Sequence, residues 1–174
     1  MSEHPAKRGS HPACSNKLYL MFHIGEERYA LEAMEIAEIL PRLQLKSVAR
    51  APHWVAGILA HRGAMVPVID LCALTFGQPA KVRTSTRLVL VNYRVDTAAP
   101  QLLGLILEQA TDTLRCSPGE FKAYGLDNPD ARYLGPVRED ESGLLQLIHV
   151  QDLLSDEVRA LLYPQPPAVI EEAQ

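Results

Sequence analysis

The side chains best suited to chemistry are a histidine, an aspartate and a cysteine that lie close together near the middle of the chain. His61, Asp70 and Cys72 offer an imidazole, a carboxylate and a thiol, the groups of many small hydrolytic and ligand-binding sites. The sequence lacks G-x-S-x-G, H-E-x-x-H, G-x-G-x-x-G and the Walker loop, with which common enzyme classes arrange such groups. A histidine beside apolar strand residues is also more often a hydrogen-bonded filler than a general base. A small β-barrel enzyme or ligand-binding protein that uses these three residues is therefore the alternative hypothesis.

A charged turn between two apolar stretches is the second candidate site. Residues 57–60 and 64–70 are apolar, and the turn between them predicts a β-hairpin in which Gly63 takes the positive φ angle of a tight turn. Arg62 is then held at the tip, where its guanidinium offers five donors in a fixed geometry that suits a carboxylate. Two interpretations stay open, a solvated turn charge and a recognition residue. We predict that Arg62 contacts Glu38 across neighbouring strands.

Composition and charge limit the class of protein. The chain has 174 residues, of which 47% are hydrophobic, so it can bury a core as one domain or as two small domains that pack closely. Its net charge of -4, with basic residues scattered along the chain, gives no electrostatic footprint for nucleic acid. No apolar run approaches the roughly 18 residues of a membrane helix, and the N-terminal region lacks the apolar core of a signal peptide. These features predict a cytoplasmic protein with no nucleic-acid partner and no direct membrane insertion.

The cysteines indicate neither a disulfide framework nor a metal site. Cys14, Cys72 and Cys116 are odd in number, widely spaced and without a C-x-x-C pair, which is typical of reduced thiols. Cys72 lies in an apolar run and is interpreted as a small core residue. We therefore expect no metal and no cofactor.

Periodicity and turn residues predict a mostly-β chain. Short helices are expected over residues 54–56, over residues 71–76 before Gly77, and over residues 156–163 after the N-cap residue Ser155. Segments 66–71 and 145–150 resemble each other, each a strand running into a short helix, which indicates two similar halves. About ten short strands in all predict a barrel or a sandwich. Besides the hairpin, strands are expected over residues 18–24, 28–31, 87–93, 102–107, 108–115, 133–137 and 144–148.

The two ends of the chain are predicted to be disordered tails. Residues 1–16 and 164–174 have no periodic apolar face that could offset the entropy of ordering. The folded domain is accordingly expected at residues 17–163.

A series of short motifs resembles a known family. From Tyr19 to Leu74 the sequence resembles the CheW family of chemotaxis coupling proteins, and the weaker likeness extends to Leu154. One departure stands out, because Ala60 and His61 replace the usual Asn and Leu of the family's N-L-R-G motif. The motifs that carry the resemblance are Gly25-Glu26-Glu27-Arg28-Tyr29, Glu38-Ile39, Pro52 with Gly57, Arg62-Gly63, and Met65-Val66-Pro67-Val68-Ile69-Asp70-Leu71.

The resemblance implies a more definite fold than the pattern alone. It implies two intimately packed SH3-like five-stranded β-barrels with short helices and a C-terminal helix. It also bears on residues 32–40, whose composition favours a helix with Ile36, Ile39 and Leu40 on one face, ended by Pro41. The resemblance implies instead one helical turn over residues 32–35 and a strand over residues 36–41.

The resemblance implies a binding function. Proteins of this family are non-enzymatic adaptors that couple the cytoplasmic tip of a methyl-accepting chemoreceptor to the regulatory domain of a CheA-like histidine kinase. That role would place the chain in the cytoplasm, at the inner membrane through receptor arrays. The implied receptor-binding residues are Ile36, Glu38, Ile39, Gly57, Ile58, His61 and Arg62. The implied kinase-binding residues are Leu40, Leu43, Leu45 and Val48, for which a covered sheet edge and a buried core strand are both open interpretations.

The departure at Ala60 and His61 suggests a particular branch of the family. Together with the nearby segment Leu40-Pro41-Arg42-Leu43, it resembles the coupling proteins of Wsp-type surface-sensing systems, whose output is a diguanylate cyclase. The sequence leaves the receptor, the kinase and the output pathway open.

Overall fold

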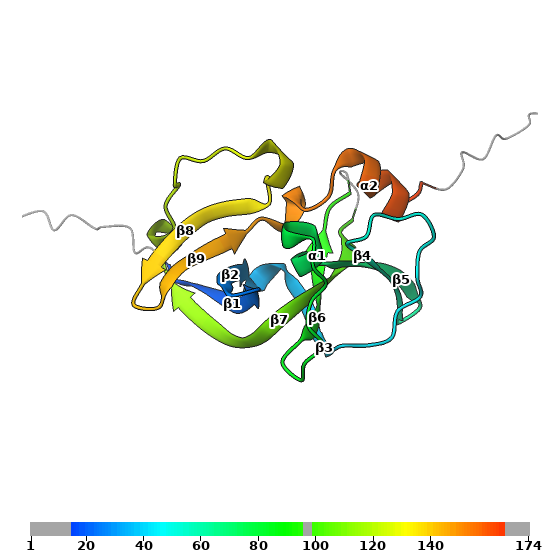
Figure 1. Ribbon diagram of the computed structural model, residues 1–174, viewed down its shortest axis with the longest axis horizontal. Coiled ribbons are helices and arrows are strands. Elements are labelled where there is room, and N and C mark those ends of the chain that lie inside the picture. Colours follow the sequence, from blue (N-terminus) through cyan, green and yellow to red (C-terminus); the bar gives the residue numbers. More distant parts are fainter. Residues whose placement is uncertain (1–14, 96–98, 166–174) are drawn as a thin grey trace, which may run out of the picture.

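The computed structural model describes residues 15–95 and 99–165, which form two five-stranded barrels that share one long strand (Figure 1). The mostly-β fold of two barrels is as predicted. The strands of the described residues are β1 (Lys17–Ile24), β2 (Glu27–Glu32), β3 (Ile36–Pro41), β4 (Val55–His61), β5 (Ala64–Asp70), β6 (Arg87–Tyr93), β7 (Gln101–Cys116), β8 (Leu134–Asp140) and β9 (Gly143–Ile148). The helices are η1 (Ala33–Glu35), α1 (Leu71–Phe76), η2 (Pro118–Glu120), η3 (Pro129–Ala131), η4 (Val150–Asp152) and α2 (Asp156–Leu162).

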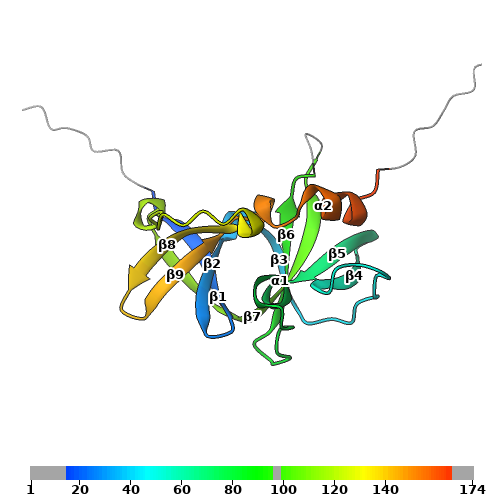
Figure 2. The ribbon, with the colours of Figure 1, turned by 45° about the horizontal axis from the view of Figure 1, so that its top comes forward.

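The shared strand is β7, which passes from one barrel to the other (Figures 1 and 2). The first barrel has the strand order β7-β1-β2-β9-β8, and the second has the order β3-β6-β7-β5-β4. Between the two halves of β7, Gln109 has a φ angle of 47° and the register with β1 shifts. The sequence predicted two separate strands here. They form one strand because a bulge bends the chain without ending the hydrogen-bond ladder.

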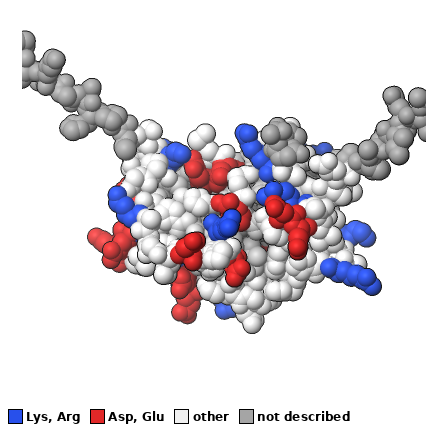
Figure 3. All heavy atoms as spheres, turned by 90° about the horizontal axis from the view of Figure 1, so that it is seen from above, with Lys and Arg blue, Asp and Glu red and all other residues white. Residues whose placement is uncertain are grey.

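Apolar side chains from both barrels form a main core around β7, and a smaller separate cluster with Tyr19 and Phe121 lies in the first barrel. Leu103, Leu105 and Leu107 point to one face of this strand and are fully buried, and Gly104 and Ile106 on the opposite face are buried too, so both faces of this part of β7 are covered. Cys72 packs into the main core and is 4% exposed, which confirms its interpretation as a core residue. Charged side chains of both signs lie on the surface (Figure 3). The two barrels therefore fold around a common interior and hold each other in place.

Most predicted elements are confirmed. Helical turn η1 followed by strand β3 agrees with the family resemblance, and α1 ends at Gly77 as expected. Helix α2 begins after Ser155, whose side chain accepts a hydrogen bond from the backbone N–H of Val158. The two similar halves are also found, since β5 runs into α1 beside the parallel strand β7, and β9 runs into η4 beside the parallel strand β2.

The helix expected over residues 54–56 is wrong: Pro52 and Val55 close only a turn, because β4 begins at Val55 and pairs at once with Ile69 of β5. The tails predicted at residues 1–16 and 164–174, and Cys14 with them, lie outside the described residues except at positions 15, 16, 164 and 165.

An ion pair joins the β8–β9 hairpin to β2 and has a pH-dependent contribution to stability. Arg28 donates from Nη1 to Oδ1 of Asp140 at 2.8 Å and from Nη2 to Oδ2 at 2.9 Å. The hydrogen bonds from Arg28 lower the pKa of Asp140 to about 2. An acid with a lowered pKa in the folded state stabilises the fold above its unfolded pKa and loses that contribution as the pH falls through the folded value.

We therefore predict that Asp140→Asn lowers the free energy of unfolding by about 1 kcal/mol at pH 7. The difference from the natural chain should shrink as the pH falls from about 4 to about 2, because the natural carboxylate is protonated in that window. Urea unfolding at a series of pH values measures this difference. Glu139→Gln, at an exposed neighbouring carboxylate, is the control and should show little effect. A difference that stays constant down to pH 2 would contradict the prediction.

Candidate partner-binding site

The second barrel has a seam between its two edge strands, β3 and β4. These strands end the order β3-β6-β7-β5-β4, and among the described strands they do not pair with each other. The segment that connects them, residues 42–54, fills part of the gap through a bridge between Lys46 and Ile58. Lys46 N donates to Ile58 O at 3.0 Å, and Ile58 N donates to Lys46 O at 2.8 Å. The remaining contact across the seam depends on side chains.

Three charged or polar side chains close the seam. Glu38 on β3 accepts from Arg62 Nη2 at 3.3 Å through Oε1, and its Oε2 lies 3.0 Å from Nε2 of His61 at the end of β4. The predicted contact between Arg62 and Glu38 is confirmed, whereas the contact between His61 and Glu38 was not foreseen. Both carboxylate oxygens of Glu38 are therefore occupied. The Arg62 side chain is 77% exposed, so most of its donors face solvent.

The β4–β5 hairpin positions these two side chains. His61 pairs with Ala64, and the two turn residues between them both have positive φ angles, 47° at Arg62 and 79° at Gly63. Positive φ at both central positions is the geometry of a type I′ turn, which matches the twist of a two-residue hairpin. The sequence predicted positive φ only for Gly63. The tight turn places Arg62 on the outside of the barrel and directs His61 toward β3.

Strands β3 and β4 also carry apolar residues that are not fully buried. Along β3, Ile39 is 46% exposed, whereas Ile36 is half-buried, as is Ile58 on β4. Gly57 is buried and lies against the backbone of Lys46. Two methionines that the sequence analysis did not select, Met34 and Met65, are also exposed near β3 and the hairpin tip, and could be found only once burial was known.

One carboxyl group next to β3 has an altered acidity. Burial, reinforced by the nearby Glu32 carboxylate, raises the pKa of Glu35 to about 7. At neutral pH this group is therefore about half protonated. The surface beside Ile36 then carries less negative charge than the sequence suggests.

The predicted kinase-binding residues lie at the end of β3 and in the connecting segment, not on one strand. Only Leu40 belongs to β3, whereas Leu43, Leu45 and Val48 lie in the connecting segment, because β3 ends at Pro41. These residues form neither a covered sheet edge nor a buried core strand, since Leu43 is 42% exposed and the other three are half-buried. A pocket of about 430 Å³ opens beside them and is lined by Arg42, Leu43, Gln44, Leu45, Ala56, Val82 and Ile106. Val82, which is not among the residues predicted from the sequence, reaches this pocket from a loop that follows α1.

The alternative set of catalytic residues is not assembled in the structure. His61 lies at one end of the β4–β5 hairpin and Asp70 at the other, roughly 20 Å apart along the strands. The Asp70 carboxylate is committed to two backbone donors, Ala73 N at 3.1 Å and Ala80 N at 2.8 Å. Burial, reinforced by Glu108, raises the pKa of Cys72 to about 12, so the thiol is not ionised at neutral pH. The three residues therefore do not form a catalytic group.

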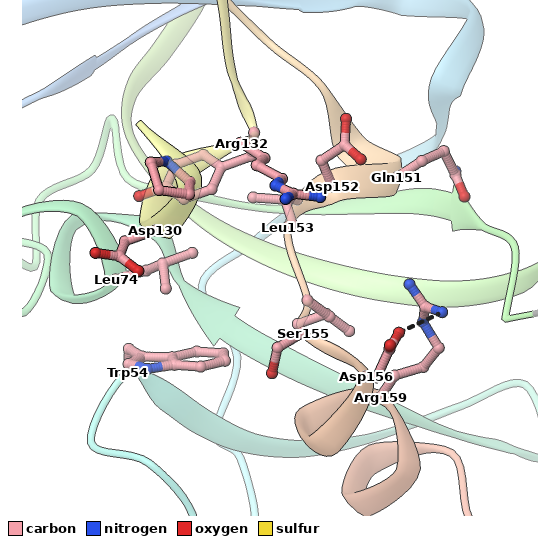
Figure 4. Close-up of a pocket in the computed structure, with 13 residues that line it drawn as sticks. Trp54, Leu74, Asp130, Arg132, Gln151, Asp152, Leu153, Ser155, Asp156 and Arg159 are labelled. Atoms are coloured by element: carbon pink, nitrogen blue, oxygen red, sulfur yellow. Dashed lines mark hydrogen bonds and ion pairs between the residues drawn. The ribbon is translucent and has the colours of Figure 1, made fainter. Parts of the chain in front are cut away.

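A separate cavity of about 520 Å³ lies between the second barrel, the segment around η3, and helix α2 with the residues before it (Figure 4). Trp54 and Leu74 line one side, and Arg132 and Arg159 come from the other. The Arg159 guanidinium is held by Asp156, with Nη1 3.2 Å from Oδ1. None of the residues lining this cavity is among the receptor-binding, kinase-binding or catalytic candidates predicted from the sequence.

Comparison with known proteins identifies the family. The family model named CheW-like domain matches residues 18–158 of this chain. The match covers most of the chain and both barrels. The chain belongs to the CheW-like domain family.

Relatives of this CheW-like chain are chemotaxis proteins. It is 25% identical to the chemotaxis protein CheW of Klebsiella aerogenes over 149 residues, which cover 83% of this chain and 85% of the relative. It is 26% identical to the chemotaxis protein CheW of Helicobacter pylori, over 78% of this chain and 80% of the relative. The crystal structure of the scaffolding protein TtCheW from Thermoanaerobacter tengcongensis has the same fold, with a TM-score of 0.71, 19% identity, and coverage of 88% of this chain and 94% of that chain.

The described part of the CheW-like chain holds no helix that is long and apolar enough to cross a membrane. It also holds no group of three or more His, Cys, Asp or Glu side chains placed to bind a metal ion.

Proposed function

We propose that this chain is a non-enzymatic adaptor that couples methyl-accepting chemoreceptors to a CheA-like histidine kinase in a bacterial chemosensory pathway. The observation that carries the proposal is the seam of the second barrel, where Glu38 of β3 contacts His61 and Arg62 of the hairpin and Ile39, the next residue of β3, is exposed. Its membership of the CheW-like family and its chemotaxis relatives support the same role. The adaptor acts in the cytoplasm and reaches the inner membrane through receptor arrays.

The receptor side of the proposal is a helix in a groove. The cytoplasmic tip of a chemoreceptor is a helical hairpin, and an amphipathic helix binds through apolar anchors whose register is set by charges. Ile36, Ile39 and Ile58 supply apolar contacts. Glu38 is occupied within the chain, so the group that remains for the partner is the exposed guanidinium of Arg62. This arrangement favours a hydrogen-bond acceptor on the receptor helix at that point.

The kinase side of the proposal uses the connecting segment of the second barrel. Leu40, Leu43, Leu45 and Val48 would contact the kinase regulatory domain, and Val82 extends the same apolar surface. The likeness to Wsp-type coupling proteins, based on Ala60 and His61, stays a prediction.

Arg62→Ala tests the proposal. The ion pair with Glu38 is exposed, and such pairs contribute about 0.2–1 kcal/mol, so the melting temperature should fall by only a few degrees. Coupling should fall far more, by about tenfold or more, because the substitution removes the exposed donor from the centre of the binding surface. The measurements are co-sedimentation with receptor–kinase assemblies and kinase autophosphorylation, beside a thermal melt.

Arg115→Ala is the matched control, since Arg115 is exposed on β7 in the first barrel and forms no ion pair within the described residues. It should leave both coupling and stability unchanged. Normal coupling by an Arg62→Ala protein of reduced stability would show that the pair serves folding alone. A hydrolytic activity abolished by His61→Ala would replace the adaptor proposal by the alternative.

A further inference from the structure

Glu38 is held by two side chains that are neighbours in the sequence. Its Oε2 lies 3.0 Å from Nε2 of His61, and its Oε1 accepts from Nη2 of Arg62 at 3.3 Å. Successive residues of an extended strand point to opposite faces, so a continuous strand could not bring both His61 and Arg62 to Glu38. They both reach it because the φ angle of Arg62 is 47°, which turns the chain back directly after His61. The two-residue turn therefore directs both side chains onto one carboxylate.

The contact with His61 is the shorter and the more enclosed of the two. The His61 side chain is 15% exposed and the Glu38 side chain 30%, whereas the side chain of Arg62 is 77% exposed. Because a carboxylate only accepts hydrogen bonds, Nε2 of His61 carries the hydrogen that joins the two groups. Arg62 makes a single long hydrogen bond from the solvent side, and water screens such an exposed pair. Glu38 is therefore held mainly by His61.

The hydrogen bond from His61 limits how Arg62 can pair with Glu38. A guanidinium binds a carboxylate most strongly when two of its N–H groups meet both carboxylate oxygens. Here His61 occupies Oε2, so only Oε1 is left for Arg62. A leucine at position 61 would fill a similar space without a donor, and would leave both oxygens to the guanidinium. We propose that His61 is a positioning residue, which prevents a two-bond pair between Arg62 and Glu38 and so keeps Arg62 available to a carboxylate of the binding partner.

The surroundings of Arg62 favour an acidic partner. Among the ion pairs of the described residues, Arg62 meets only Glu38. Between Glu38 and Asp70 the sequence has no acidic residue and four basic ones, Arg42, Lys46, Arg50 and Arg62. A hydrogen bond between two charged groups is also roughly twice as strong as one between neutral groups. The role of His61 in partner binding rests on the proposed adaptor function, and it requires the receptor helix to present an aspartate or a glutamate to Arg62.

A double-mutant cycle measures the coupling between Glu38 and Arg62 without any partner. Glu38→Gln, Arg62→Gln and the double variant are made in the natural chain and again in the His61→Leu protein, and urea unfolding gives their unfolding constants. The coupling, expressed as a factor in the unfolding constant, should rise about fivefold with leucine at position 61, because the guanidinium gains a second oxygen.

Two further substitutions make this measurement specific to the hydrogen bond. His61→Gln keeps an N–H donor for Oε2 of Glu38, so it should restore the natural coupling. His53→Leu is the matched control, since His53 is exposed in the connecting segment, and it should leave the coupling unchanged. Equal coupling with histidine and with leucine at position 61 overturns the proposal, as does a failure of glutamine to restore the natural value.

Titration calorimetry with the cytoplasmic tip fragment of a chemoreceptor from the same organism tests the consequence for binding. His61→Leu should weaken binding by about fivefold or more, because Arg62 is then held by Glu38, and His61→Gln should bind as the natural chain does. Changing the acids of the tip one at a time to amides should identify one whose loss abolishes the difference between the natural and His61→Leu proteins.

The two measurements separate the role of His61 from the adaptor function. Equal affinity of the natural and His61→Leu proteins for the tip fragment overturns the proposal that His61 keeps Arg62 available to the partner. A natural chain that does not bind the fragment overturns the adaptor function for that receptor. The double-mutant cycle needs no receptor, so it still decides whether His61 limits the pair between Arg62 and Glu38.

Discussion

Gly57→Ala should destabilise this protein by about 3 kcal/mol or more, which corresponds to a fall of about 10 °C in melting temperature. Gly57 has a φ angle of 148°, which a residue with a Cβ rarely adopts. A Cβ at this position would lie 2.5 Å from the carbonyl oxygen of Lys46 and 3.0 Å from Cβ of Leu45. That oxygen accepts the hydrogen bond from Ile58 N, so it cannot move without breaking the bridge across the seam.

Gly63→Ala, in the same hairpin, separates the cost of a positive φ angle from the cost of a steric clash. Gly63 also has a positive φ angle, 79°, but nothing lies within 4 Å of the position of its missing Cβ. We expect this control to cost only about 1 kcal/mol, the penalty of the left-handed backbone. Urea unfolding of both variants measures the difference. Equal losses for the two proteins would show that the contact with Lys46 contributes nothing. Because the displaced segment also carries Leu43 and Leu45, Gly57→Ala should impair kinase coupling as well.

Asp70→Ala should be the second large loss, about 2–4 kcal/mol. The Asp70 side chain is 8% exposed and joins two elements: Oδ1 caps the first turn of α1 through Ala73 N, and Oδ2 holds the following loop through Ala80 N. Alanine would leave both N–H groups without an acceptor, and Ala80 is itself only 9% exposed. An unsatisfied buried donor costs more than the hydrogen bond contributes, because it has also lost its water.

Asp70→Asn keeps one of the two acceptor oxygens and is therefore a variant of intermediate effect. Its single side-chain oxygen can cap α1, but its amide group would face the N–H of Ala80, so we expect an intermediate loss of about 1–2 kcal/mol. Asp152→Ala, at an exposed acid in η4, should change the free energy of unfolding by less than about 0.5 kcal/mol. An Asp70→Ala protein as stable as the natural chain would contradict the capping role. Loss of a hydrolytic activity without loss of stability would favour the enzyme alternative.

Gly57 and Asp70 affect the proposed adaptor through the structure of its second barrel. Gly57 and Asp70 were singled out in the sequence as a receptor-binding and a catalytic candidate, respectively. Both are buried in the folded protein. Their predicted effects are therefore on the shape of the second barrel and its seam. Arg62, exposed at the hairpin tip, has the opposite profile, with a small expected effect on stability and a large one on coupling.

The local elements could be predicted from the sequence because each depends on residues that are neighbours along the chain. The polar turn at Arg62 and Gly63 lies between apolar runs, Gly77 follows α1, and Ser155 precedes α2, so turns and caps are visible in the sequence itself. Residues 32–40 show the limit of this reasoning. Their composition favours a helix, but residues 36–41 form β3 because pairing with β6 outweighs a weak intrinsic preference.

Only the tertiary structure decided what lies across the seam and which candidates face solvent. Strands β3 and β4 do not pair with each other among the described strands, so no hydrogen-bond register relates Glu38 to His61, and the contact between them depends on how the second barrel curves. The single strand β7 likewise depends on a bulge at Gln109, for which the sequence has no glycine as a signal. Val82 and Leu43 meet at one pocket from loops about forty residues apart. Periodicity reports which face of an element is apolar, whereas the packing of distant elements determines whether that face is covered.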